Sequence, residues 1–191
     1  MVKSIKSFLN QYLSDIVNSI SKADILEIKK ASDLIVKTVK NKKTIFVCGN
    51  GGSAAIANHY ICDYLKFLRQ HSKLKPKVIS LSSNIETITA ISNDFSYDQI
   101  FKYQAESLFS KNDLLIAISS SGKSENIKEV VKFSKKKKVK VIGFSGFEGG
   151  FLKKNSDISV HVPINNYGIA EDSHHILMHV ILQFLIVSQK K

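Results

Sequence analysis

The stretch Thr44-Ile-Phe-Val-Cys-Gly-Asn-Gly-Gly-Ser53 determines how the rest of the chain is interpreted. Its first five residues form a short apolar run with β-branched side chains, which predicts a buried strand, and the glycines that follow indicate a tight turn. A helix is expected next, over about 53–68. Glycines let backbone N–H groups converge, and a helix N-terminus attracts negative charge, so this strand, loop and helix are suited to binding an anion.

A second stretch further along the chain has the same order. An expected strand over 113–118 runs into Ser119-Ser-Ser-Gly-Lys-Ser124, which places four hydroxyls in six residues before an expected helix over 124–137. Serine and glycine are also ordinary turn and cap residues, so either loop alone is compatible with a purely structural role. Two such loops at equivalent strand ends favour a phosphate site, because open α/β sheets bind ligands there.

The remaining sequence alternates expected strands and helices. Further strands are expected at 78–81, 139–144 and 158–162, and further helices at 5–20, 24–40, 84–92, 97–109 and 170–187. The near-continuous apolar strands predict an α/β fold, with a doubly wound, five-stranded parallel sheet covered by helices on both faces. Two helices precede the first strand and are long enough to pack across the sheet or against another subunit. We expect a single domain over residues 1–191.

The composition is that of a globular protein, with 43% hydrophobic residues in a chain of 191. No apolar run is long enough to span a bilayer, and the first residues lack the pattern of a signal peptide, so we expect a cytoplasmic protein without a membrane partner. Cys48 and Cys62 lack the spacing of a metal site, and both are expected to be reduced core residues.

The net charge of +12 is compatible with binding nucleic acid, an acidic surface or an anionic substrate. A solvated, lysine-rich surface is the simpler interpretation, so no nucleic-acid partner is expected. The pattern Gly49-x-Gly51-x-x-Ala54 also satisfies the dinucleotide fingerprint. That fingerprint expects a ribose-binding carboxylate about 20 residues later, and none is present here, which argues against a dinucleotide.

Together the two loops resemble the SIS (sugar isomerase) domain. The residues that carry the resemblance are Phe46-Val-Cys-Gly-Asn-Gly-Gly-Ser-Ala-Ala55 with His59, and Ile116-x-Ile-Ser-x-Ser-Gly-x-Ser124. Thr89-Ala-Ile-Ser-Asn-Asp94 with Tyr97-Asp98, Gly146-x-x-Gly-Gly150, and Glu171-Asp-x-His174 with His179 narrow it to the phosphoheptose isomerase group. The resemblance covers nearly the whole chain, including the two leading helices.

The resemblance implies an aldose–ketose isomerase that converts sedoheptulose 7-phosphate to a heptose 7-phosphate for surface polysaccharide, in homotetramers with active sites between subunits. It implies a sugar contact at Asp94 and a phosphate site made by Asn50, Gly51, Gly52, Ser53, Ser119, Ser120, Ser121 and Ser124. It also implies a divalent metal, zinc in several members, held by His59, Asp63, Glu171 and His179. Asp63, Glu171 and His179 are the expected acids and bases.

Three positions depart from the family pattern. Asp63 stands where Glu is usual, Glu171 where Gln is usual, and Gly168 where Asp is usual. Aspartate is shorter than glutamate by one methylene, about 1.5 Å, and a small misplacement of a catalytic group can cost about 100-fold in rate. Two non-catalytic alternatives therefore stay open: an SIS-type phosphosugar-binding regulator, and a scaffold that binds a replication initiator.

Residue spacing limits how the proposed ligands can meet. His59 and Asp63 are four residues apart and share a helix face, where they can pair or share a metal. Eight residues of straight helix between Glu171 and His179 rise about 12 Å. Either the last helix begins after Glu171, or two subunits contribute. Glu171, His175 and His179 also form a stripe at i, i+4 and i+8, which makes His175 a rival ligand.

Overall fold

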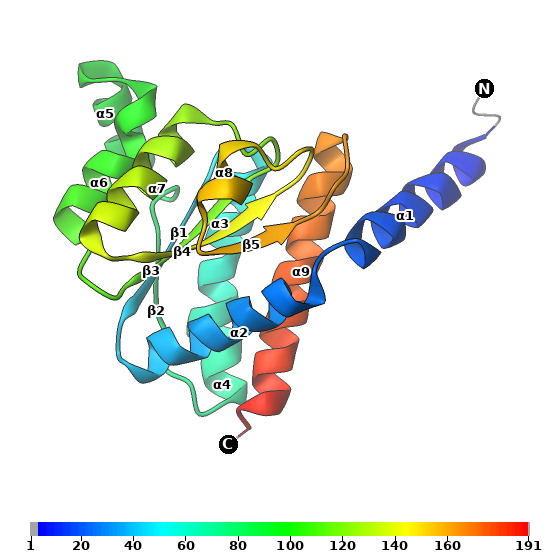
Figure 1. Ribbon diagram of the computed structural model, residues 1–191, viewed down its shortest axis with the longest axis horizontal. Coiled ribbons are helices and arrows are strands. Elements are labelled where there is room, and N and C mark those ends of the chain that lie inside the picture. Colours follow the sequence, from blue (N-terminus) through cyan, green and yellow to red (C-terminus); the bar gives the residue numbers. More distant parts are fainter. Residues whose placement is uncertain (1–3, 191) are drawn as a thin grey trace.

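Five parallel strands in the order β2-β1-β3-β4-β5 form the centre of the structure, a computed structural model that describes residues 4–190 (Figure 1). The strands are Thr44–Gly49 (β1), Lys77–Ser80 (β2), Leu114–Ser119 (β3), Lys140–Ser145 (β4) and Ile158–His161 (β5). Each adjacent pair is parallel. The α/β fold and the five-stranded parallel sheet predicted from the sequence are confirmed.

The helices agree with the predicted pattern except at two places. They are Ile5–Ser21 (α1), Ile25–Lys40 (α2), Gly52–Cys62 (α3), Arg69–His71 (α4), Ile85–Asp94 (α5), Ile100–Leu108 (α6), Glu125–Lys137 (α7), Gly150–Asn155 (α8) and Tyr167–Ser188 (α9), with a π-helical segment at Asp63–Leu68 and a 3₁₀ turn at Tyr97–Gln99. The sequence did not predict α8 or the π-helical segment. A last helix that begins after Glu171 is also excluded, because α9 begins at Tyr167.

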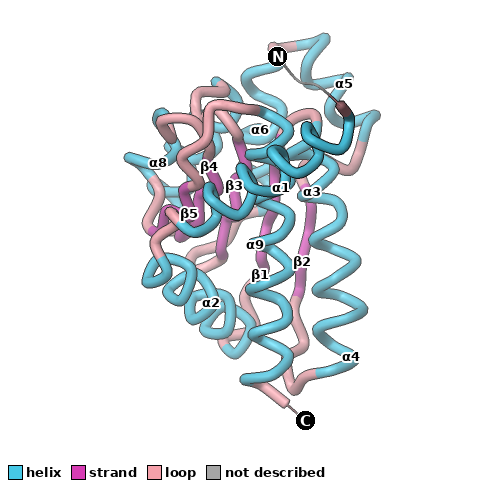
Figure 2. The backbone as a smooth tube through the Cα atoms, turned by 90° about the vertical axis from the view of Figure 1, so that its right-hand side faces the viewer, coloured by secondary structure: helices cyan, strands magenta, loops and turns pink. Residues whose placement is uncertain are grey.

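Two apolar cores lie on opposite faces of the sheet. Alternate residues of β1 point to opposite sides, so Ile45 and Val47 join one core while Phe46 and Cys48 join the other. Helices α2, α3 and α9 cover the first face, and α6, α7 and α8 cover the second (Figures 1 and 2). Helix α5 contributes Ile91 to the second core. Burial on both faces explains the near-continuous apolar strands.

The first helix extends away from the sheet (Figure 1). It begins with a capping box between Ser4 and Ser7, and its attachment to α9 includes a hydrogen bond from Tyr12 Oη to Asp172 Oδ2 of 2.7 Å. Large apolar side chains on α1 stay exposed, namely Ile5, Phe8, Leu9, Leu13 and Val17. An amphipathic helix normally buries its apolar face, so α1 carries an apolar surface that no other part of residues 4–190 covers.

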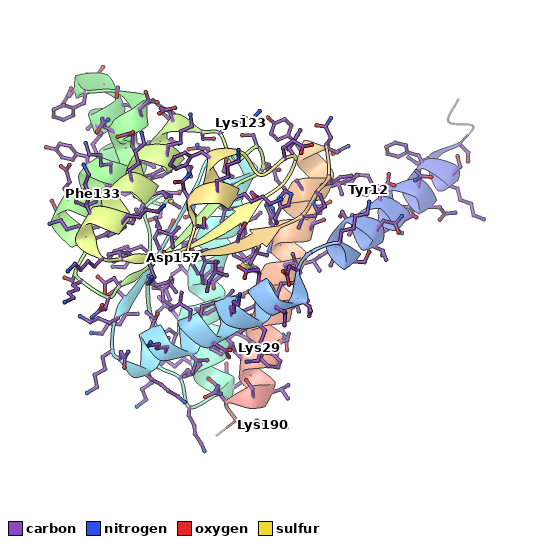
Figure 3. The ribbon with its side chains drawn as sticks, viewed as in Figure 1. Tyr12, Lys29, Lys123, Phe133, Asp157 and Lys190 are labelled. Carbon is purple, nitrogen blue, oxygen red and sulfur yellow. The ribbon has the colours of Figure 1, made fainter. Side chains whose placement is uncertain are left out.

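Cys48 is buried in β1, as expected. Cys62 is exposed at the end of α3, so the expectation of a core thiol is wrong there: this position of α3 faces away from the sheet. Lysines account for most of the positive charge; the Lys29 side chain extends along the surface of α2 (Figure 3), where it pairs with Asp33. Within residues 4–190, no helix combines the length and hydropathy needed to cross a membrane.

Candidate active site

The two serine- and glycine-rich loops meet at the carboxyl ends of β1 and β3. These strands are neighbours, and the chain proceeds outward from them in opposite directions, to β2 on one side and to β4 and β5 on the other. This position is the topological switch point, where open α/β sheets bind ligands. A cavity of about 140 Å³ opens there, lined by Asn50, Ser53, Ile118, Ser119, Ser120, Ser121, Ser124, Tyr167 and Glu171.

The first loop is shaped by glycines and by a fixed asparagine. Gly51 has a φ of +53°, which side chains disfavour, and it directly precedes α3. A Cβ at Gly52 would collide with the Glu171 carboxylate, so glycine there lets α9 approach the loop. The Asn50 and Asn126 amides exchange hydrogen bonds of 2.9 and 3.0 Å, which fixes the Asn50 side chain at the cavity wall.

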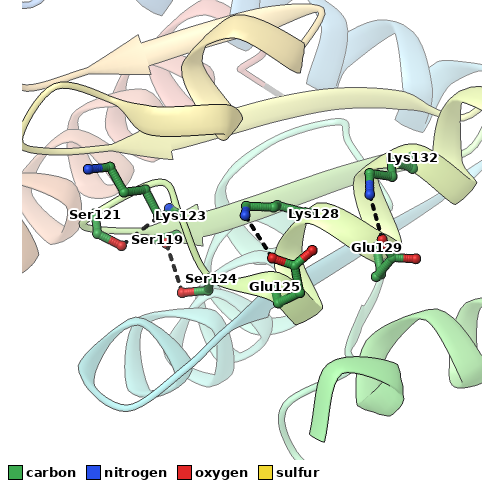
Figure 4. Close-up of polar contacts among 8 residues, drawn as sticks. All are labelled: Ser119, Ser121, Lys123, Ser124, Glu125, Lys128, Glu129 and Lys132. Carbon is green, nitrogen blue, oxygen red and sulfur yellow. Dashed lines mark hydrogen bonds and ion pairs between the residues drawn. The ribbon is translucent and has the colours of Figure 1, made fainter. Parts of the chain in front are cut away.

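The second loop leaves serine hydroxyls available. Ser119 Oγ and Ser124 Oγ lie 3.3 Å apart, and Ser121 Oγ accepts a hydrogen bond from the Lys123 backbone N–H at 3.2 Å (Figure 4). Ser124 precedes α7 but makes no capping bond with its side chain. Within the described chain, the buried Ser120 hydroxyl has no hydrogen-bond partner. Buried hydroxyls are usually paired, so this loop has the free donors that an anion needs.

The backbone of this loop packs against the segment around the start of α8. Gly122 has a φ of +65°, and a Cβ there would collide with the carbonyl oxygen of Gly149. The segment before α8 therefore packs directly against the serine loop, and the Leu152 N–H donates to the Gly122 carbonyl at 3.1 Å. Glycine at both contact points allows the two loops to support each other.

Glu171 lies on α9 at the edge of the cavity. Its pKa is raised, first by burial and then by the neighbouring Asp172 carboxylate. A raised pKa means that this carboxyl binds a proton more readily than an exposed glutamate does. Glu171 is thus placed to act on a ligand beside the serines.

A second cluster lies further along α3 and α9. His59 and His179 bring their Nε2 atoms to 3.2 Å of each other. Asp63 Oδ2 lies 3.1 Å from His179 Nε2 and 3.5 Å from His59 Nε2. Three of the four expected metal ligands, His59, Asp63 and His179, therefore lie together within one chain.

His175 joins the same cluster. Its ring lies 4.9 Å from the His59 ring and 4.7 Å from the His179 ring, centroid to centroid. Burial lowers the pKa of His175, and the neighbouring His179 and His59 lower it further, which favours the neutral imidazole. The i, i+4, i+8 stripe on α9 was the signal that pointed to this residue.

Two expected site residues lie apart from the histidine cluster. Glu171 is two turns before His179 on the continuous helix α9 and faces the serine loops instead. Asp94 ends α5, is exposed, and accepts a hydrogen bond from the Asn93 side chain at 2.9 Å. None of the hydrogen bonds or ion pairs among residues 4–190 joins Asp94 to the serine loops.

The donor atoms of the second cluster fit a divalent metal. His59, His175 and His179 each offer one ligand nitrogen, and these atoms all lie within 4.8 Å of one another. Asp63 Oδ2 is buried and lacks a well-directed hydrogen bond from any described residue. Imidazole nitrogens with a carboxylate oxygen are a usual zinc ligand set.

A larger cavity, of about 560 Å³, opens at the opposite, amino end of the strands. Its acidic groups serve the fold: Asp113 accepts from the backbone N–H groups of Thr44 and Ser110, at 2.9 and 2.8 Å. Asp157 pairs with Lys140 at 2.6 Å. Because open sheets bind ligands at the carboxyl ends of their strands, the serine loops are the better candidate site.

Comparison with known proteins agrees with the geometry. The SIS domain family model matches residues 9–146. A phosphoheptose isomerase of Aliarcobacter butzleri (strain RM4018) is 38% identical over 158 residues, which are 83% of each chain. A phosphoheptose isomerase of Buchnera aphidicola subsp. Schizaphis graminum is 36% identical over 192 residues, covering 99% of this chain and 97% of that protein.

A solved structure of a phosphoheptose isomerase has the same fold as this chain. The phosphoheptose isomerase of Neisseria gonorrhoeae superposes with a TM-score of 0.87 at 25% identity. The match covers 95% of this chain and 98% of the Neisseria chain. The likeness therefore extends over nearly the whole chain.

Proposed function

Because this chain belongs to the SIS domain family, and within it to the phosphoheptose isomerases, we propose that it is an aldose–ketose isomerase of sedoheptulose 7-phosphate. The product is a heptose 7-phosphate, a precursor for surface polysaccharide. The observation that carries the proposal is the pairing of a serine-lined cavity with a carboxylate–imidazole cluster further along α9 and along α3 with its π-helical continuation.

The serine loops bind the phosphate. Ser53, Ser119, Ser120, Ser121 and Ser124 provide hydroxyls, and Asn50, Gly51 and Gly52 provide an amide and backbone N–H groups at the start of α3. Helices α3 and α7 both begin at the cavity, so their N-terminal N–H groups add favourable electrostatics. Asp94 contacts the sugar, and it requires a neighbouring subunit or a movement of α5 to do so.

The carboxylate–imidazole cluster carries out the proton transfer. Aldose–ketose isomerisation moves a proton between adjacent carbons through a base and its partner acid. Asp63 is the base closest to an imidazole, and His179, 3.1 Å away, is its partner. Glu171 is the alternative base, on the phosphate side of the cavity.

A divalent metal, zinc by preference, belongs to the same cluster. The resemblance assigns it to His59, Asp63, Glu171 and His179, and the first, second and fourth lie together in one chain. When bound, the ion would supply a Lewis acid that polarises the sugar carbonyl.

We also propose a homotetramer in the cytoplasm, built from one domain over residues 1–191. The exposed apolar face of α1 supports assembly, because Leu9, Leu13 and Val17 are 53%, 51% and 65% exposed in a single chain. No nucleic-acid partner is proposed.

The decisive test is an NMR assay of sedoheptulose 7-phosphate turnover, with and without added zinc. We expect a new heptose 7-phosphate anomeric signal, and its loss in His179→Ala. Phosphosugar binding without turnover under either condition would refute the isomerase. It would favour the non-catalytic regulator or scaffold that the changes at Asp63, Glu171 and Gly168 leave open.

A further inference from the structure

We propose that His175 is a metal ligand, and that His59, His175 and His179 of one chain form a three-imidazole site for a divalent cation such as zinc. This inference rests on the proposed function, because it concerns the metal of the same active site. It changes the ligand set: the resemblance assigns Glu171 to the metal, whereas this inference assigns His175.

Two of the three imidazoles already have almost the required separation, and the third lies close to both. Two nitrogens bound at about 2.0–2.1 Å to tetrahedral zinc lie about 3.4 Å from each other. His59 Nε2 and His179 Nε2 are 3.2 Å apart, and a ligand nitrogen of His175 is within 4.8 Å of both. A rotation of the His175 side chain that brings its nitrogen closer would complete the set.

Two buried polar atoms of this cluster lack a hydrogen-bond partner among the described residues. His175 Nε2 is buried and accepts or donates no hydrogen bond within residues 4–190. Asp63 Oδ2 is buried too, and among the described residues its polar contacts are with the His59 and His179 nitrogens. Buried polar atoms are normally satisfied, and one cation among these groups satisfies the imidazole nitrogens and the carboxylate together.

The packed helices hold the backbones of the three histidines in place. His175 and His179 are one turn apart on α9, whose neighbouring residues Leu177 and Met178 are fully buried in the core. His59 follows Ile56 and Ala57 of α3, which are buried in the same core. Ligands on packed helices lose little freedom when a metal binds, so the site is preorganised.

Glu171 is positioned for a different task. Its carboxylate lies against Gly52 and lines the serine cavity, and its backbone is about 12 Å from that of His179 along the helix. One cation cannot join both within one chain, whereas His175 lies midway. The three-imidazole site therefore needs no second subunit and leaves Glu171 free beside the phosphate.

The test measures metal binding on the purified full chain after removal of metal with a chelator. Cobalt(II) titration reports the ligand set through its visible spectrum, and competition with a coloured chelator gives the zinc affinity. Loss of an indirect partner of a metal costs about 10–100-fold in affinity. We expect His175→Ala to lose more than this and to alter the cobalt spectrum.

Two matched variants serve as controls. Glu171→Gln removes the residue assigned by resemblance, and His71→Ala removes a histidine outside the cluster. Both should keep the zinc affinity and the cobalt spectrum of the unchanged protein. Circular dichroism and thermal unfolding of the metal-free proteins check folding, and His175→Gln replaces His175→Ala if the latter is unfolded.

Unchanged zinc affinity in both His175 variants, or a loss in Glu171→Gln alone, overturns the proposal. Absence of any zinc binding by the unchanged protein also overturns it, and an NMR assay that still shows turnover would leave the isomerase intact. Conversely, zinc binding that depends on His175 without any turnover would support this site and contradict the proposed function.

Discussion

Replacing Ser119 and Ser124 together by alanine tests the phosphate site directly. Their hydroxyls are 3.3 Å apart at the carboxyl end of β3 (Figure 4), so both can reach one phosphate group. A hydrogen bond to a charged group contributes about 1.5–3 kcal/mol. At about 1.4 kcal/mol per factor of ten, each hydroxyl is expected to contribute about 10–100-fold in affinity. The double variant should bind sugar phosphates at least about 100-fold more weakly.

The fold should tolerate this change. The Gly122 N–H donates to Ser119 Oγ at 3.2 Å and also to the Ser119 carbonyl oxygen at 3.0 Å, so it keeps an acceptor after the substitution. Ser124 Oγ makes no capping bond to α7. We therefore expect the free energy of unfolding to fall by no more than about 1 kcal/mol.

Isothermal titration with sedoheptulose 7-phosphate, and separately with inorganic phosphate, measures the loss. The control is Ser83→Ala with Ser156→Ala, since these hydroxyls donate to the Ser80 and Leu152 carbonyls at 3.0 and 2.7 Å, away from the cavity. An unchanged affinity in a folded Ser119/Ser124 double variant would refute the reasoning. An equal loss of affinity in the control variant would show that the weaker binding does not come from the two hydroxyls at the cavity.

Three further outcomes are expected. Asp63→Asn should lower kcat by about 10²–10⁴-fold, the usual contribution of a general base, with little change in sugar-phosphate affinity; initial rates at saturation that match the unchanged protein would contradict this. Leu9→Asp with Leu13→Asp should shift sedimentation velocity towards smaller species, because it places charge on the apolar face of α1, and an unchanged tetramer peak would argue against that interface. Glu27 has a pKa held below its usual 4.5 chiefly by the hydrogen bond from Lys30, so its contribution to stability is present above pH 4.5 and lost as the pH falls through the lowered pKa. Glu27→Gln should consequently lower the melting temperature at pH 7 but not at pH 2.5. An equal fall in melting temperature at both pH values would show that ionised Glu27 does not provide this stability.

Local patterns were enough to predict the sheet and the serine loops. A strand that is buried on both faces is apolar throughout, and the glycines after β1 mark its end without reference to any other part of the chain. Parallel strands then bring their carboxyl ends to one edge, so Ser53 and Ser119 could be placed together before the structure was known. The short helix α8 was missed because Gly149 and Gly150 at its start are typical of a turn.

The histidine cluster depended on tertiary packing that no local pattern contains. The spacing of Glu171, His175 and His179 shows which residues share a face of α9, but not which turn of that face lies opposite His59. That register is set by the packing of α3 and α9 on the same core, and it pairs Gly52 with Glu171 at one end and His59 with His175 and His179 further along. Sequence reasoning therefore found the candidates and could not choose among them.

The register of these two helices also bears on the length of the sugar. In the site that we propose, Glu171 lines the phosphate cavity, and His175 and His179 follow about 6 and 12 Å further along the helix. In a ketoheptose 7-phosphate the reacting carbons are C1 and C2. Six C–C bonds separate C1 from C7 and five separate C2 from C7, and the ester oxygen then joins C7 to the phosphorus. With bonds of about 1.5 Å in an extended chain, that span is about 9 Å. A phosphate bound among the serines in this way would bring C1 and C2 between the turns of His175 and His179, beside Asp63. A pentose phosphate would be shorter by about 2.5 Å and would leave its reacting carbons short of this position, which is the physical reason to expect a preference for a seven-carbon substrate.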